Sequence, residues 1–141
     1  MSTNSRPSFM TIPLAHQVAD KLCAMYETHG TARLPSSRFR DLVDVMIIIS
    51  RRGGAELAAD SVTSAVVTEQ ARRGITIPPD LPPPGTQWAI GYNRMALRQL
   101  PRTLNRLEPS LNMLRAFAGP ILTGTASGTW HPQYHRWQTA D

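Results

Sequence analysis

The chain contains little cysteine, little lysine and no long hydrophobic segment. Cys23 is the only cysteine among 141 residues, which excludes an intrachain disulfide and a cysteine metal cluster. The apolar run at residues 45–49 is far shorter than the roughly 20 residues of a membrane-spanning helix. The N-terminal sequence MSTNSRPSFM is polar and lacks the hydrophobic centre of a signal peptide. We therefore expect no transmembrane segment and no secretion by a signal peptide.

Motifs of the common enzyme classes are also missing. The sequence has no glycine-rich nucleotide loop, no HExxH, no nucleophile elbow and no paired carboxylates in an apolar setting. Asp41 and Asp44 fall close together, but two neighbouring arginines can neutralise them. His131 and His135 are separated by a proline and have no third ligand nearby. The sequence thus predicts no enzyme, no cofactor, no small-molecule substrate and no metal site.

The basic residues are almost all arginine. Lys21 is the only lysine among 15 basic residues, which stand against 10 acidic residues and give a net charge of +5. Arginine presents a fork of donors that fits phosphate oxygens, and a basic excess favours a negatively charged partner. A GC-rich genome, which favours arginine codons, is the alternative explanation for the excess.

Residues 88–107 are the centre of the sequence-based hypothesis. This stretch has an arginine at every fourth position from 94 to 106 and no acidic residue. On a helix, residues four apart share one face, so the guanidinium groups would form a stripe that is either solvated or binds an external polyanion. Pro101 should kink this helix or split it into two segments. The predicted nucleic-acid-binding residues are Arg94, Arg98, Arg102 and Arg106.

The motif Arg-Arg-Gly occurs twice, at residues 51–53 and 72–74. Each copy is expected at the end of a helix, where arginine complements the helix dipole and glycine caps the last turn. Paired phosphate contacts are the alternative role. The further nucleic-acid-binding candidates are therefore Arg51, Arg52, Arg72 and Arg73.

The spacing of apolar residues predicts an all-α fold, with about five helices in a small bundle. Residues 75–86 are rich in proline and should form an extended crossover. The chain is expected to be a single domain. Its parts are an extended arm (1–11), a three-helix part (12–74), the proline-rich linker (75–86), the arginine-stripe helices (87–122) and an aromatic tail (123–141).

The tail combines a spacer rich in Gly, Ser and Thr with a cluster of aromatic side chains. Large rings that carry one polar atom are enriched at interfaces between proteins. The predicted subunit-contact residues are Trp130, Tyr134 and Trp137.

Four short features carry a resemblance to a known family. They are RPSF at residues 6–9, AIGY at 89–92 after a glycine-ended linker, LNRL at 104–107, and a short apolar helix that continues to AGP at 118–120. In these features and in its size, the chain resembles the major coat proteins of rod-shaped and filamentous archaeal viruses. The similarity is greatest over residues 85–122.

The resemblance implies an all-α coat protein that pairs with itself or with a paralogous coat protein. Such dimers would assemble into a helical filament that packages double-stranded DNA. The arginines would contact the phosphate backbone without reading bases, so no recognition motif is needed. The protein would then be part of a virion that assembles in the host cytoplasm, and it would not be an enzyme.

Two other functions remain open from the sequence. A helical coat protein or nucleoprotein could enclose single-stranded RNA, for which Trp88 and Tyr92 are the nearby candidates for base stacking. A small helical adaptor or effector could instead bind an acidic protein through the same arginine face.

Overall fold

The computed structural model describes residues 12–139, so the arm predicted for residues 1–11 lies outside the described residues. The described part contains five helices and three short strands. In chain order they are α1 (Leu14–Tyr26), α2 (Phe39–Arg51), β1 (Gly54–Ala58), α3 (Ala59–Arg73), α4 (Trp88–Ala96), α5 (Leu107–Thr123), β2 (Thr129–His131) and β3 (Arg136–Gln138).

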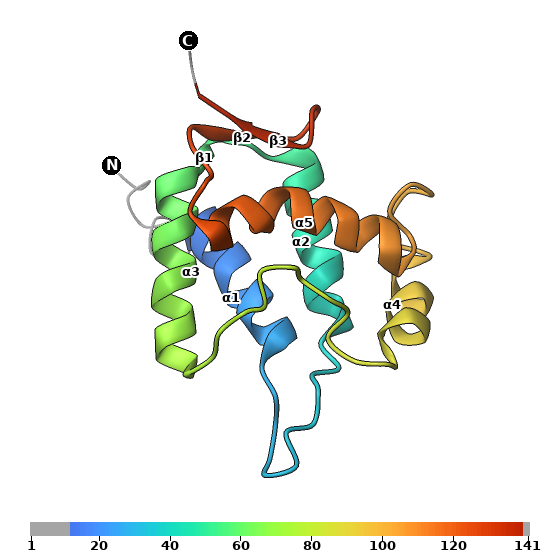
Figure 1. Cartoon of the computed structure of the whole chain (residues 1–141). Helices are drawn as coiled ribbons and strands as arrows, with labels where there is room; N and C mark the ends of the chain where they lie inside the picture. The colour runs from blue at the N-terminus through green and yellow to red at the C-terminus, as the bar shows by residue number, and fades with distance from the viewer. Residues whose placement is uncertain (1–11, 140–141) are drawn as a thin grey trace, which may run out of the picture.

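Helix α1 lies between α2 and α3, and α5 runs across this group (Figure 1). Val18 and Leu22, four residues apart on α1, are fully buried, as are Leu42 and Met46 on α2. The four-residue spacing places each pair on one face of its helix, and burial of these faces drives the packing. The lone Cys23 lies in the same interface with no exposed surface.

The predicted all-α fold is wrong, because the structure contains a three-stranded antiparallel sheet in the order β1-β2-β3. Gly54 pairs with Trp130 across the first pair of strands, and Trp130 pairs with Trp137 across the second. The residues of β1 were expected to begin a helix, and the sheet partners were expected to be a spacer and tail. Pairing between segments so far apart in sequence overrides the local helical preference of residues 55–58.

The proline-rich segment after α3 is not helical, contains turns and is anchored to the helices. Gly74 ends α3 in the left-handed conformation, with φ of 68°. The side chains of Ile77 and Leu81 are buried. The Tyr26 hydroxyl donates to the Pro82 carbonyl over 2.7 Å. This linker therefore contributes to the core and fixes the path from α3 to α4.

Residues 88–107 were expected to form a helix that Pro101 kinks or splits, but the second half of this stretch is not α-helical. Helix α4 ends at Ala96, and residues 97–106 form consecutive turns before α5 begins. Pro101 has no backbone N–H to continue a helix, and the turns allow Leu100 and Leu104 to be buried. In residues 12–139, no helix has the length and apolar character needed to cross a membrane.

Candidate functional site

The four arginines of the predicted stripe lie at one end of the molecule, but they do not share one helix. Arg94 is in the last turn of α4, Arg98 and Arg102 are in the turns that follow, and Arg106 is the N-cap residue of α5. All four side chains are exposed. We call these four residues the arginine surface.

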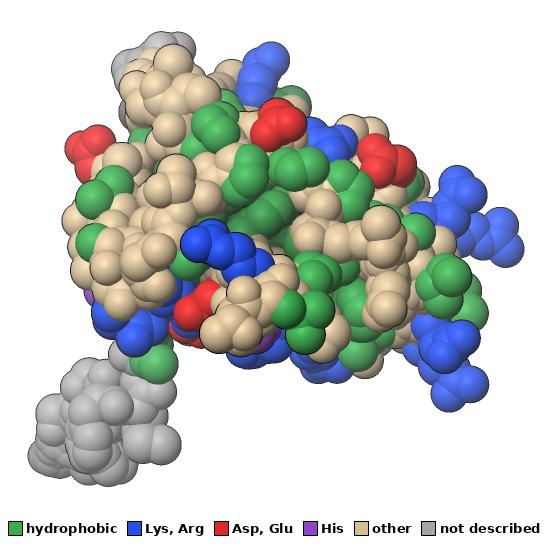
Figure 2. Space-filling view, turned by 60° about the horizontal axis from the view of Figure 1, so that its bottom comes forward, with side chains coloured by type: hydrophobic (Ala, Val, Ile, Leu, Met, Phe, Trp, Pro, Cys, Tyr) green, Lys and Arg blue, Asp and Glu red, His purple; other side chains and the backbone are tan. Residues whose placement is uncertain are grey.

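Basic side chains project into solvent at the right of Figure 2, at the end that carries α4 in Figure 1, and no acidic side chain lies among them in that view. Within the described residues, no member of the arginine surface forms an ion pair, whereas most other arginines do. The surface is therefore a local concentration of positive charge that the chain itself does not neutralise.

The segment that carries these arginines is held by buried hydrogen bonds. The hydroxyl groups of Tyr92 and Ser110 are 2.8 Å apart, and Ser110 Oγ donates to the Leu104 carbonyl over 2.8 Å. Asn93 Oδ1 accepts from the backbone N–H of Leu107, also over 2.8 Å. These bonds join α4, the turns and the start of α5. The backbone positions of the arginine surface are thus fixed before any ligand binds.

The two Arg-Arg-Gly copies differ in what their arginines contact. Arg51 is exposed and has no ion pair among the described residues. Arg52 donates through two nitrogens to the carboxylate of Glu56. Only the second copy has the predicted capping glycine, because α2 ends with Arg52 in an extended conformation.

Arg73 has a structural role inside the protein. Its guanidinium lies 2.5 Å from Asp20, 2.7 Å from Glu27 and 3.0 Å from Glu69, and its side chain is 13% exposed. Arg72 also binds Glu69, and hydrogen bonds from Arg72 and Arg73 lower the pKa of Glu69 to about 2. Both arginines are therefore paired with acids of their own chain, and a contact with phosphate stays a prediction.

The aromatic tail folds back onto the core. Trp130 is fully buried, and its indole Nε1 donates to the Ile49 carbonyl over 2.8 Å. Trp137 donates to the Phe117 carbonyl over 2.8 Å, and both indoles pack against the Phe117 ring. Tyr134 is 59% exposed. Trp130 has no exposed surface with which to contact a subunit, whereas a contact by Tyr134 stays a prediction.

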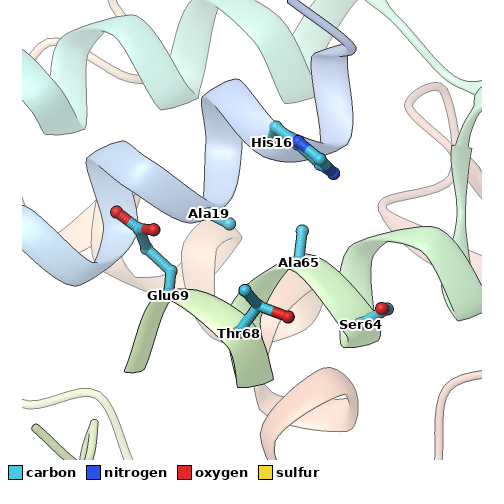
Figure 3. Close-up of a pocket in the computed structure, with 6 residues that line it drawn as sticks. All are labelled: His16, Ala19, Ser64, Ala65, Thr68 and Glu69. Carbon is cyan, nitrogen blue, oxygen red and sulfur yellow. The ribbon is translucent and has the colours of Figure 1, made fainter. Parts of the chain in front are cut away.

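A small pocket between α1 and α3 holds polar side chains but no catalytic arrangement (Figure 3). Its volume is about 120 Å³. The His16 imidazole and the Glu69 carboxylate lie toward opposite ends of the group, and Ser64 is remote from Glu69 (Figure 3). Glu69 is engaged by arginines. No hydroxyl, imidazole and carboxylate converge as nucleophilic catalysis requires.

A larger pocket of about 370 Å³ lies beside the turns that carry Arg102. It is formed by the end of α2, the turns after α4, one side of α5 and the β2–β3 turn. Its lining residues are Ser50, Pro101, Thr103, Leu104, Pro109, Asn112, Met113, Ala116 and His135. Sequence reasoning missed this pocket, because its residues span 85 positions and follow no common spacing.

Carboxylates and histidines are scattered over the described surface. No group of three His, Cys, Asp or Glu side chains in residues 12–139 could hold a metal ion. Asp41 and Asp44, three residues apart on α2, are each bound by arginine or lysine.

The fold and its charged surface define a small helical protein with a capping sheet and a fixed, unneutralised arginine surface. The model of the family described as "Nucleotidyl transferase AbiEii toxin, Type IV TA system" matches residues 3–126. The chain belongs to this family. No curated protein and no solved structure matches the chain.

The family corrects four expectations from the sequence. The chain is not a member of the archaeal viral coat proteins, and its function is not that of a virion coat protein that packages DNA. The prediction that the protein is not an enzyme is also overturned, since the family is one of nucleotidyltransferase toxins. The coat-protein resemblance rested on tetrapeptides such as AIGY and LNRL, which are too short to identify a family. The expected role as a structural protein of a virus is corrected with it.

Proposed function

We propose that this protein acts as a nucleotidyltransferase toxin of a type IV toxin–antitoxin system, and that its arginine surface binds the nucleic acid that accepts the nucleotidyl group. The observation that carries this proposal is the family match over residues 3–126. In such a reaction, an acceptor oxygen forms a bond to the α-phosphorus of a nucleoside triphosphate. The bond from that phosphorus to the β-phosphate oxygen breaks, and pyrophosphate leaves.

The contribution of the described residues is phosphate binding. Arg94, Arg98, Arg102 and Arg106 are exposed and lack acidic partners within residues 12–139. Guanidinium groups can bind phosphate oxygens through two parallel hydrogen bonds. The hydrogen bonds that fix the turns reduce the entropy cost of holding these groups in place. We assign no step through a metal ion.

The activity is tested with the whole chain. The purified protein is incubated with each nucleoside triphosphate, labelled at the α-phosphate, and with total RNA or duplex DNA. We expect label to become covalently attached to one class of nucleic acid, with release of pyrophosphate. If no labelled product forms with any triphosphate in either arm, nucleotidyl transfer to nucleic acid by this chain is excluded.

The arginine surface is tested by a charge-matched pair of variants. Replacing Arg94, Arg98, Arg102 and Arg106 by Gln should weaken nucleic-acid binding and lower the salt slope by about 3, since each contact to a single strand contributes roughly 0.7. The control replaces Arg38, Arg40, Arg52 and Arg72, which are 57%, 55%, 50% and 64% exposed and paired with acids. Equal losses in both variants would show that only net charge matters and would contradict a specific surface.

A further inference from the structure

The pocket beside the arginine surface has a composition that selects its ligand. Its walls are apolar, and Leu104 and Met113 are 8% and 4% exposed. None of its lining residues is an acid, a lysine or an arginine. With a volume of about 370 Å³, it falls in the range of small-molecule sites, which combine apolar walls with a few polar groups. This lining therefore suits an uncharged chemical group of modest size.

Polar groups on three sides of the pocket have hydrogen-bonding capacity left. Asn112 accepts from Arg115 through Oδ1, which leaves its amide N–H groups without a partner among the described residues. Ser50 Oγ donates to the Ile47 carbonyl, so its lone pairs can still accept. Thr103 and His135 add a hydroxyl and an imidazole from two other segments. Donors and acceptors placed around an apolar slot suit a heterocyclic base and a ribose.

Two arginine residues are direct chain neighbours of residues that line this uncharged pocket. Arg51 directly follows the lining residue Ser50, and Arg102 lies between the lining residues Pro101 and Thr103. Consecutive Cα atoms are about 3.8 Å apart, so the backbone of each arginine lies next to a lining residue, although neither arginine is itself part of the lining. Both are exposed and form no ion pair within residues 12–139. A ligand with an uncharged part and an anionic group could place the uncharged part in the pocket and the anionic group near the two arginines.

We propose that this pocket binds the nucleoside part of a nucleotide, with the phosphates held by Arg51 and Arg102. The inference rests on the proposed function, which requires a nucleoside triphosphate as donor. The base and ribose lie against Leu104 and Met113, and Asn112 and Thr103 hydrogen-bond to their polar edges. Glu108 is the nearest acid in sequence to the lining residues of α5, and it is paired with Arg115 at 3.4 Å.

His135 closes the pocket from the sheet side. It occupies the turn between β2 and β3, with φ of 53°, in the left-handed region that few residues other than glycine adopt. The next residue, Arg136, lies over the Tyr134 ring at 5.3 Å. Buried Trp130 on β2 anchors this hairpin to α2. The turn thus places the imidazole beside a pocket whose other walls are the end of α2, the turns after α4 and one side of α5.

The test separates the two parts of the ligand. Binding of the four nucleoside triphosphates, of the free nucleosides and of tripolyphosphate is measured by calorimetry on the full chain. In Ala116→Phe, a ring fills the pocket from α5. This variant should weaken triphosphate and nucleoside binding about tenfold or more, a loss of about 1.4 kcal/mol, and leave tripolyphosphate binding unchanged. The double variant Arg51→Gln/Arg102→Gln should show the opposite pattern.

The matched control is Ala89→Phe, which adds the same ring to an exposed position at another pocket, beside Pro83 and Leu107. It should bind every probe as the wild type does. Thr103→Val changes only a hydroxyl and tests the site even if Ala116→Phe folds poorly. Wild-type triphosphate affinity in Thr103→Val, or in a folded Ala116→Phe, would overturn the site.

The outcomes also distinguish this inference from the proposed function. If the wild type transfers label to nucleic acid and Ala116→Phe transfers it equally well, the pocket is not the nucleotide site and the proposed function stands. If nucleotides bind with the expected pattern but no label is transferred, the site stands and nucleotidyl transfer by this chain is excluded.

Discussion

The indole nitrogen of Trp130 donates to the backbone carbonyl of Ile49 over 2.8 Å, across 81 positions of sequence. Ile49 lies in the last turn of α2, where helix carbonyls lack an intrahelical donor. The tail therefore supplies a hydrogen-bond donor to a carbonyl at the end of α2 that has no donor within its own helix. This contact also holds the β2–β3 hairpin above the pocket.

Trp130→Phe should lower the free energy of unfolding by about 1–3 kcal/mol, because the Ile49 carbonyl loses its donor in a buried position. Thermal or denaturant unfolding measures the change. Tyr134→Phe, at a residue that is 59% exposed, is the control and should stay within about 0.5 kcal/mol of wild type. Similar losses in both variants would mean that the hydrogen bond to Ile49 contributes little.

Arg73→Gln should destabilise the fold by about 2 kcal/mol, between the values of exposed and of buried ion pairs. The reason is that Asp20, Glu27 and Glu69 keep their negative charges and lose the cation that they share. Arg72→Gln is the neighbour control. Its side chain is 64% exposed and pairs with Glu69 alone among the described acids, so Arg72→Gln should cost clearly less than Arg73→Gln.

The free energy of unfolding should fall at acid pH, in part because Glu69 becomes protonated. Hydrogen bonds from Arg72 and then Arg73 lower the pKa of this carboxyl from 4.5 to about 2. A lowered pKa in the folded state gives stability that is complete above the unfolded pKa and is lost as the pH falls from about 4.5 to about 2. Burial raises the pKa of Asp41, which acts in the opposite direction. Glu69→Gln should therefore unfold with a shallower pH dependence in this range. An unchanged acid profile would exclude Glu69 as the source.

Two glycines in helices should respond differently to alanine. A Cβ at Gly91 of α4 would overlap the Phe39 ring of α2, so Gly91→Ala should cost about 1–3 kcal/mol through overpacking. A Cβ at Gly119 of α5 would meet no atom within 4 Å apart from its chain neighbours. Gly119→Ala should change the stability by less than about 1 kcal/mol, because the higher helix propensity of alanine opposes the crowding of its Cβ by Pro120. Unfolding curves of the two variants measure both changes, and equal losses would contradict the packing of α4 on α2.

The helices and the linker could be predicted from local sequence, but the sheet and the pocket could not. Apolar spacing and the Arg-Arg-Gly motif at residues 72–74 indicate the end of α3, because these signals act within a few residues. The sheet depends on pairing of Gly54 with Trp130, and no local pattern encodes a partner at that separation. The spacing of the arginines predicted the arginine surface. The turns that carry part of it could not be predicted, because they depend on the burial of Leu104 in the folded protein.

The family was missed for a related reason. Its model covers most of the chain, whereas the coat-protein resemblance used four short motifs. Such motifs reflect capping and apolar spacing, which many helical proteins share. The exposed arginines fit any polyanion, so they could not separate a coat protein from an enzyme that handles nucleotides.

Because the only thiol is buried, its rate of chemical modification can be used to measure local unfolding around α1. Burial raises the pKa of Cys23 to about 12, and only a thiolate reacts readily with disulfide reagents. At neutral pH, modification must therefore wait until α1 separates from its neighbours. The reaction rate then reports the free energy of that opening, without any label or engineered probe.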